Sequence, residues 1–153
     1  MEAQDSFFDL GDNTALVCVD HQQYQKLVVP QLIDMTYKVH LGLFEEDVLL
    51  KLTTYSYNVV IVYENFKGST PQNNPILKEM IRRPGSERRQ HFIVLLSHRF
   101  ATNDATTAFV QSVDQIVNIS DLANFKPVLR RGVTQHRELY GSFHETLKAV
   151  QTI

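Results

Sequence analysis

The sequence predicts an α/β domain in which a parallel sheet is covered on both faces by helices. The first observation is the run 57–64, a stretch of β-branched and aromatic residues that stops abruptly at polar ones, with similar apolar runs at 14–19 and 92–96. Such runs are typical of strands buried on both faces. The second observation is that amphipathic, helix-like stripes separate these runs. Alternating strands and helices indicate βαβ units and a parallel sheet.

The expected elements follow from apolar spacing and from proline and glycine positions. Strands are expected at 14–19, 37–41, 58–63, 92–96 and 115–119. Helices are expected at 23–35, 45–55, from 75 to just before 84, at 104–112 and at 122–150. Pro30 should interrupt and kink the first helix, because proline removes a backbone donor. With right-handed crossovers, these elements predict a flavodoxin-like, three-layer α/β/α sandwich with strand order 2-1-3-4-5.

Composition narrows the class of protein. The 153 residues fit one domain, divided into a lead-in at 1–13, an α/β core at 14–121 and a long helix at 122–153. The formal net charge of −2 offers no general attraction for nucleic acid or an anionic membrane. The single cysteine excludes an internal disulfide and a cysteine-rich zinc site. No apolar run is long enough for a membrane helix and no signal peptide is evident, so a cytoplasmic location is expected.

The last helix is longer than one small sheet can cover. Its apolar residues recur in steps of three and four over 122–150, which is close to a heptad rhythm and corresponds to roughly 40 Å of helix. The overhang carries a candidate interaction surface made of Tyr140, Phe143, Leu147 and Val150. Two interpretations stay open. The surface either pairs with a second copy or another protein, or folds back onto the core.

Polar and aromatic residues stand where the strands end. Asp20 and His21 follow the first strand, Tyr63 and Glu64 end the third, and Ser97 ends the fourth. With these positions the chain resembles the CheY-like receiver domain of bacterial response regulators. In that family the first strand ends in two acids that hold Mg²⁺, and the third ends in the aspartate that accepts phosphate. A hydroxyl residue ends the fourth strand, and a lysine followed by proline ends the fifth.

The resemblance covers roughly residues 14–131 and departs from the family pattern at most of the reactive positions. It places Tyr63 at the phospho-acceptor position and Ile119 at the lysine position, with Ser120 in place of the proline. His21 replaces the second acid. Tyrosine cannot form an acyl phosphate, so the resemblance implies a pseudo-receiver. The chain is also similar to the degenerate receiver portion of certain bacterial zinc-ribbon proteins, although it contains no ribbon.

The acidic residues at the strand ends have two interpretations each. Glu64 either imitates the charge of a phosphorylated receiver or simply solvates the following loop. A metal ion could be bound jointly by Asp20, His21 and Glu64, and it would be a transition metal, because histidine binds transition metals better than it binds Mg²⁺. The other interpretation is that His21 is simply exposed beside Asp20. Ser97 and His98 point to opposite faces because they are neighbours on a strand, so a hydrolase is not expected.

Four arginines, Arg82, Arg83, Arg88 and Arg89, form a candidate basic patch around Pro84 and Gly85. The patch either binds an acidic partner, a phosphate-rich messenger or nucleic acid, or is a solvated helix end. No aromatic residues are interleaved with these arginines, which argues against nucleic acid.

The sequence thus predicts a non-phosphorylatable receiver that acts as a protein–protein interaction module in a bacterial two-component-type pathway. It would present the surfaces around its fourth and last helices and form a homodimer or bind another signalling protein. The alternative is a small-ligand sensor for an anion, nucleotide or metal. No enzymatic activity, cofactor, nucleic-acid partner or membrane contact is expected.

Overall fold

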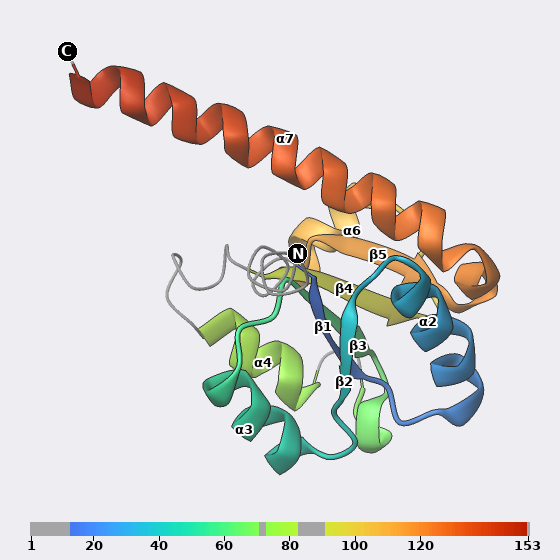
Figure 1. Ribbon diagram of the computed structural model, residues 1–153. Helices are drawn as coiled ribbons and strands as arrows, with labels where there is room; N and C mark the ends of the chain where they lie inside the picture. Colours follow the sequence, from blue (N-terminus) through green and yellow to red (C-terminus); the bar gives the residue numbers. More distant parts are fainter. Residues whose placement is uncertain (1–12, 71–72, 83–90, 153) are drawn as a thin grey trace, which may run out of the picture.

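The computed structural model describes residues 13–70, 73–82 and 91–152, with side chains up to residue 139. Five β-strands and five α-helices lie within these ranges (Figure 1). The strands are β1 (Thr14–Cys18), β2 (Lys38–Leu41), β3 (Val59–Tyr63), β4 (Phe92–Ser97) and β5 (Gln115–Asn118). The helices are α2 (Gln22–Asp34), α3 (Glu45–Thr54), α4 (Pro75–Arg82), α6 (Ala105–Gln111) and α7 (Phe125–Thr152). Two short 3₁₀ helices, η1 (Phe66–Gly68) and η2 (Ile119–Asn124), complete the described elements.

The sheet has the predicted order β2-β1-β3-β4-β5, and every neighbouring pair is parallel. Side chains alternate between its two faces, so each strand contributes to two cores. One core joins alternate strand residues such as Ala15 and Val17 to α2 and α7. The other joins their neighbours, such as Leu16, to α3, α4 and α6. The predicted flavodoxin-like fold is confirmed.

Helix α2 differs from its prediction, because it continues through Pro30 as one helix from Gln22 to Asp34. Pro30 lies on the exposed side, where the carbonyl left without a donor can bind water. His21 caps the start of α2, and its Nδ1 accepts a long hydrogen bond of 3.4 Å from the Tyr24 amide.

Helix α7 begins three residues later than predicted, after η2, and runs without interruption for 28 residues. Its first turn is fastened to α2. The Gln31 amide accepts from the Lys126 N–H at 2.7 Å and donates to the Leu122 carbonyl at 2.7 Å. At about 1.5 Å per residue the helix is about 42 Å long. Its C-terminal half projects beyond the sheet in Figure 1, so the helix itself does not fold back.

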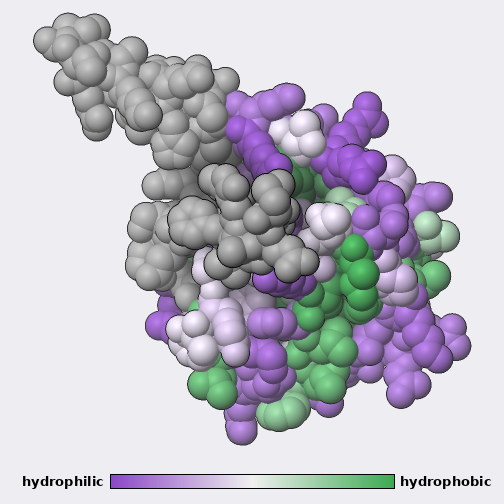
Figure 2. Space-filling view, viewed as in Figure 1, coloured by the Kyte–Doolittle hydropathy of each residue, from purple (hydrophilic) through white to green (hydrophobic). Residues whose placement is uncertain are grey.

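Strand β2 forms one edge of the sheet, and the surface on this side is partly apolar. Figure 2 shows hydrophobic surface gathered over this region between hydrophilic areas. Leu41, Leu43 and Phe44 are 37%, 43% and 52% exposed there. Among the described residues, no helix has both the length and the apolar character that crossing a membrane requires.

Candidate functional site

The carboxyl ends of β1, β3 and β4 bring the predicted site residues to one edge of the sheet. Tyr63 is paired in register with Leu96, so the residues that follow these two strands are neighbours. In open α/β sheets this edge is where ligands usually bind. The structure therefore brings Asp20, Tyr63, Glu64 and Ser97 to one end of the sheet, as the sequence predicted, together with His98, and these five residues are called the strand-end site below.

Tyr63, at the position of the phospho-acceptor, is closed off by neighbouring rings. Its Oη lies 2.7 Å from His98 Nε2, in a hydrogen bond whose direction depends on the imidazole tautomer. The Tyr24 ring meets the Tyr63 ring edge-on, with centroids 5.5 Å apart. Tyr63 is 8% exposed. Burial chiefly, followed by Tyr24 and Glu64, raises the pKa of Tyr63, so its phenol stays neutral and available for this hydrogen bond.

Glu64 is buried, being 2% exposed, and the interpretation that it solvates a loop is wrong. Its Oε2 accepts a hydrogen bond of 2.8 Å from the His98 N–H, which ties the end of β3 to the loop after β4. Its Oε1 is shielded from solvent and has no hydrogen-bond partner among the described residues. A buried carboxylate oxygen without a partner is costly, so this atom is the clearest sign of an unfilled interaction at the strand ends.

Asn74 fixes the backbone next to this carboxylate, a role that the sequence did not predict for it. Its Nδ2 donates to the carbonyls of Tyr63 and Glu64 at 3.0 and 3.3 Å. Its Oδ1 accepts from the N–H groups of Ile76 and Leu77 at 3.0 and 3.2 Å, which caps α4. The signal in the sequence was an asparagine directly before the proline that starts a helix.

The three candidate metal ligands do not form a metal site. Asp20 Oδ2 accepts from the Lys67 N–H at 3.0 Å. The His21 ring caps α2 and stacks on Tyr24 with centroids 3.8 Å apart. Glu64 is turned toward the His98 amide. Within the described ranges, no three histidine, cysteine, aspartate or glutamate side chains are grouped so as to hold a metal ion. The weak metal candidate is corrected accordingly, because each side chain already binds a backbone amide.

Ser97 has a structural task. It is fully buried, and its Oγ accepts from the N–H groups of Arg99 and Phe100 at 3.1 Å each. Its partner in register on β5 is Asn118. Asn118 donates to the Phe100 carbonyl at 2.8 Å, so the serine and the asparagine together fix the loop between β4 and α6.

The lysine position carries no charge. Ile119 follows β5 directly, and its half-buried side chain packs against the core that contains α2 and α7. Asn118, one residue earlier, presents an amide at the strand end and accepts from the Ser120 N–H at 3.0 Å. The end of β5 thus presents an apolar side chain beside a neutral amide.

The two remaining candidate surfaces fall largely outside the described side chains. Arg82 is exposed and pairs with Glu79 at 2.7 Å, whereas Arg83, Arg88 and Arg89 lie outside the described residues. The side chains of the interaction surface, Tyr140, Phe143, Leu147 and Val150, are also outside them, although α7 continues through these positions.

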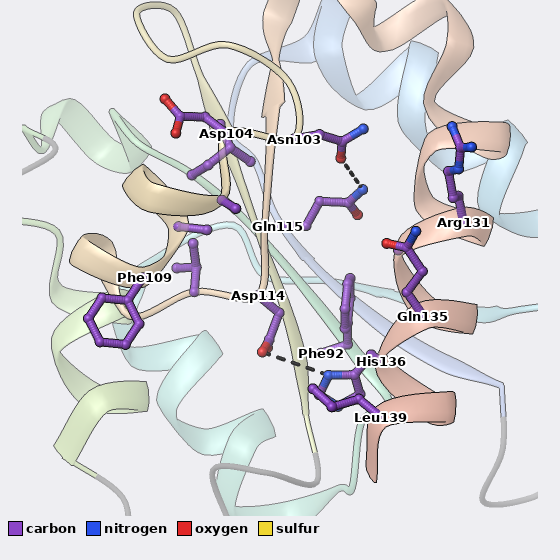
Figure 3. A pocket seen from close by; sticks show the side chains of 15 residues that line it. Phe92, Asn103, Asp104, Phe109, Asp114, Gln115, Arg131, Gln135, His136 and Leu139 are labelled. Carbon is purple, nitrogen blue, oxygen red and sulfur yellow. Dashed lines mark hydrogen bonds and ion pairs between the residues drawn. The ribbon is translucent and has the colours of Figure 1, made fainter. Parts of the chain in front are cut away.

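A groove of about 510 Å³ lies between α6, β5 and α7 (Figure 3). Phe109 of α6 and Leu139 of α7 line it and are 85% and 68% exposed. Between the helices lie Asp114, which is 3.9 Å from His136 of α7, and Gln115. The sequence predicted partner-binding faces around these two helices but gave no sign of a groove between them.

With the site described, the class of fold is clear: the chain has the fold of response-regulator receiver domains, the CheY-like form of the flavodoxin-like sandwich. It is similar to an orphan response regulator of H. pylori, HP1043, with 12% identity and a TM-score of 0.58 over 80% of this chain and 98% of that one. It is also similar to the chemotaxis response regulator CheY4 of Vibrio cholerae, with 18% identity and a TM-score of 0.58 over 78% and 98% of the two chains.

A third similar structure is a DNA-binding response regulator of the LuxR family from Staphylococcus aureus. It shares 18% identity and a TM-score of 0.53 over 79% of this chain and 98% of that one. At these identities the likeness establishes the fold. No protein-family model and no curated protein matches the chain.

Proposed function

We propose that this chain is a pseudo-receiver, a protein–protein interaction module of two-component-type signalling that is not switched by phosphorylation. The observation that carries the proposal is the hydrogen bond of 2.7 Å between Tyr63 and His98. It fills the phospho-acceptor position with a neutral phenol that cannot form an acyl phosphate. The uncharged Ile119 supports the same conclusion, because the side chain at this position offers no ammonium to stabilise a phosphoryl group.

Intact mass after incubation with acetyl phosphate and Mg²⁺ tests the proposal. We expect an unchanged mass, with a phosphorylatable receiver domain in the same tube as the positive control. A gain of one phosphoryl group on a carboxylate of this chain would overturn the proposal. If mass is gained, the variant Glu64→Gln distinguishes phosphorylation at the buried carboxylate from phosphorylation elsewhere.

The groove between α6 and α7 is the surface that best suits a protein partner. It combines the exposed apolar side chains of Phe109 and Leu139 with polar groups such as Arg131 at its margin. Exposed apolar surface rimmed by polar residues is characteristic of interaction sites. The variant Phe109→Ser should reduce partner binding without unfolding the chain. Leu50→Ser is the matched control, because it also removes an exposed apolar side chain, but from α3, which does not line the groove.

A homodimer through α7 is part of the same proposal. The length of the helix beyond the sheet supports it, since an apolar heptad rhythm needs a second surface to cover it. Sedimentation of the full-length chain should show a dimer, and Phe143→Glu with Leu147→Glu should yield a monomer. A full-length protein that sediments as a monomer at high concentration rules the dimer out.

The second candidate function is sensing of a small ligand at the strand ends. The unpartnered Oε1 of Glu64 favours it, because a ligand donor would satisfy that oxygen. A thermal-shift screen with nucleotides and divalent metals tests this candidate, since a ligand that binds the native state raises its stability. The absence of any shift would remove it. Catalysis has less support, because the Ser97 hydroxyl is buried and occupied by two backbone amides.

A further inference from the structure

A small cavity lies at the amino ends of β1 and β2, the opposite end of the sheet from the strand-end site. It lies where Asn13 precedes β1 and Tyr37 precedes β2, and it is open to solvent. Exposed residues of α7 line its other side. Its volume is about 160 Å³. At about 30 Å³ per water molecule it holds about five waters, well below the roughly 300 Å³ at which sites for drug-sized ligands begin. The size suits a small ion.

Tyr37 places a hydroxyl group at this cavity. Tyr37 is 8% exposed, and its ring packs in the core between the sheet, α2 and α7. Its hydroxyl makes no hydrogen bond with any described residue, so it is available to a ligand. Burial raises the pKa of Tyr37 and the charge of Arg137 partly offsets this, so the phenol is a neutral donor beside a guanidinium.

Two arginines line the same cavity without counter-charges. Arg130 and Arg137 are seven residues apart on α7, which places them on one side of the helix two turns apart. Neither forms an ion pair within the part of the chain that the structure describes. The nearby carboxylate of Asp34 is already paired with Lys126, and Arg130 adds only a longer-range interaction to that pair. The cavity therefore has an excess of positive charge.

We propose that this cavity binds a small oxyanion of the phosphate class, either inorganic phosphate or the phosphate group of a small phosphomonoester. Arg130 and Arg137 neutralise its charge, and the hydroxyls of Tyr37 and Thr134 donate to its oxygens. Guanidinium groups suit this role because their fixed donors match the geometry of phosphate oxygens. None of the residues that line this cavity belongs to the strand-end site, so the proposal does not depend on the proposed function.

Binding of inorganic phosphate to the full-length chain tests the proposal. Phosphate is titrated by calorimetry and by thermal unfolding, at constant ionic strength maintained with sodium chloride. The melting temperature should rise with phosphate concentration by mass action. Arg130→Gln and Arg137→Gln should each weaken binding by about tenfold or more, and Tyr37→Phe by about threefold to tenfold, because hydrogen bonds to a charged group are stronger than neutral ones.

Arg131→Gln is the matched control, because it removes the same charge from the adjacent residue of α7, which lines the groove beside α6 instead. Its phosphate affinity should stay within about twofold of the parent. Glycerol phosphate is titrated in parallel, and whichever compound binds more tightly identifies the source of the phosphate group. Three outcomes would each overturn the proposal. The melting temperature rises equally with chloride alone, phosphate affinity falls equally in Arg131→Gln and Arg130→Gln, or neither compound binds.

Discussion

Gly132→Ala should destabilise this protein, although alanine is the better helix former. A Cβ built at position 132 would lie 2.6 Å from Oε1 and 2.7 Å from Cδ of Gln115, closer than real Cβ atoms approach. Gln115 is 5% exposed, and its Nε2 donates to Asn103 Oδ1 at 2.8 Å and to the Val128 carbonyl at 3.0 Å. The amide must leave both acceptors before the new methyl group fits.

The expected size of the effect follows from these contacts. Losing two hydrogen bonds costs about 1 kcal/mol each, and burial leaves the amide no easy replacement. Alanine returns about 0.8–1.0 kcal/mol of helix propensity. The net loss in the free energy of unfolding is therefore about 1–2 kcal/mol, which corresponds to about 3–6 °C in melting temperature for a chain of this size.

Urea unfolding of Gly132→Ala, Gln115→Ala and the double variant measures this coupling. The double variant has no amide to displace, so its loss should be smaller than the sum of the single losses by about 1 kcal/mol. Gln135→Ala, at an exposed position of the same helix, should change stability by less than about 0.5 kcal/mol. If Gly132→Ala stabilises the protein by about 1 kcal/mol, as at an unobstructed helix position, the reasoning is refuted.

Three further predictions concern other parts of the molecule. Asn74→Ala should lower the free energy of unfolding by about 2 kcal/mol, because it removes the cap of α4 and two further hydrogen bonds. A loss below about 0.5 kcal/mol in urea unfolding would contradict this prediction. Burial chiefly raises the pKa of Tyr57 to about 12, so the contribution of its neutral phenol to stability is complete below pH 10 and is lost as the pH rises through about 12. The variant Tyr57→Phe should abolish the phenolate absorbance that titrates near pH 12. It also removes the hydrogen bond between Tyr57 and His40. The hydrogen bond from Lys126 lowers the pKa of Asp34 below 3.8. The pair therefore stabilises the protein above pH 3.8, and this stabilisation is lost as the pH falls through the lowered pKa of Asp34 in the folded protein. If the titration of Asp34 in NMR spectra is unchanged in Lys126→Met, the pair is absent in solution.

Much of the fold was predictable because each layer has its own pattern of residues. Continuous apolar runs such as 92–96 mark strands covered on both faces, and helical stripes between them mark the covering layers. The interruption expected at Pro30 was wrong, because a proline on the exposed side of a helix leaves its orphan carbonyl open to water. The start of α7 was placed three residues early, because the sequence does not separate a 3₁₀ turn from the first turn of an α-helix.

The site was predictable only in part. Strand ends can be located from the sequence, so Asp20, Tyr63 and Ser97 were placed at the correct edge of the sheet. The partners of these residues could not be located in this way. His98 reaches Tyr63 across 35 positions of sequence, and nothing local to either residue specifies that contact.

The sequence by itself determined the order of strands and helices, the presence of Tyr63 and Ile119 at the strand ends, and a last helix longer than its sheet. These are properties of residue type and spacing along one chain. The tertiary structure decided that Glu64 is buried, that Gln115 holds α7 close to β5, and that Tyr37 meets two arginines in one cavity. Such contacts depend on the directions of side chains from different elements, and these directions are fixed only when the layers pack together.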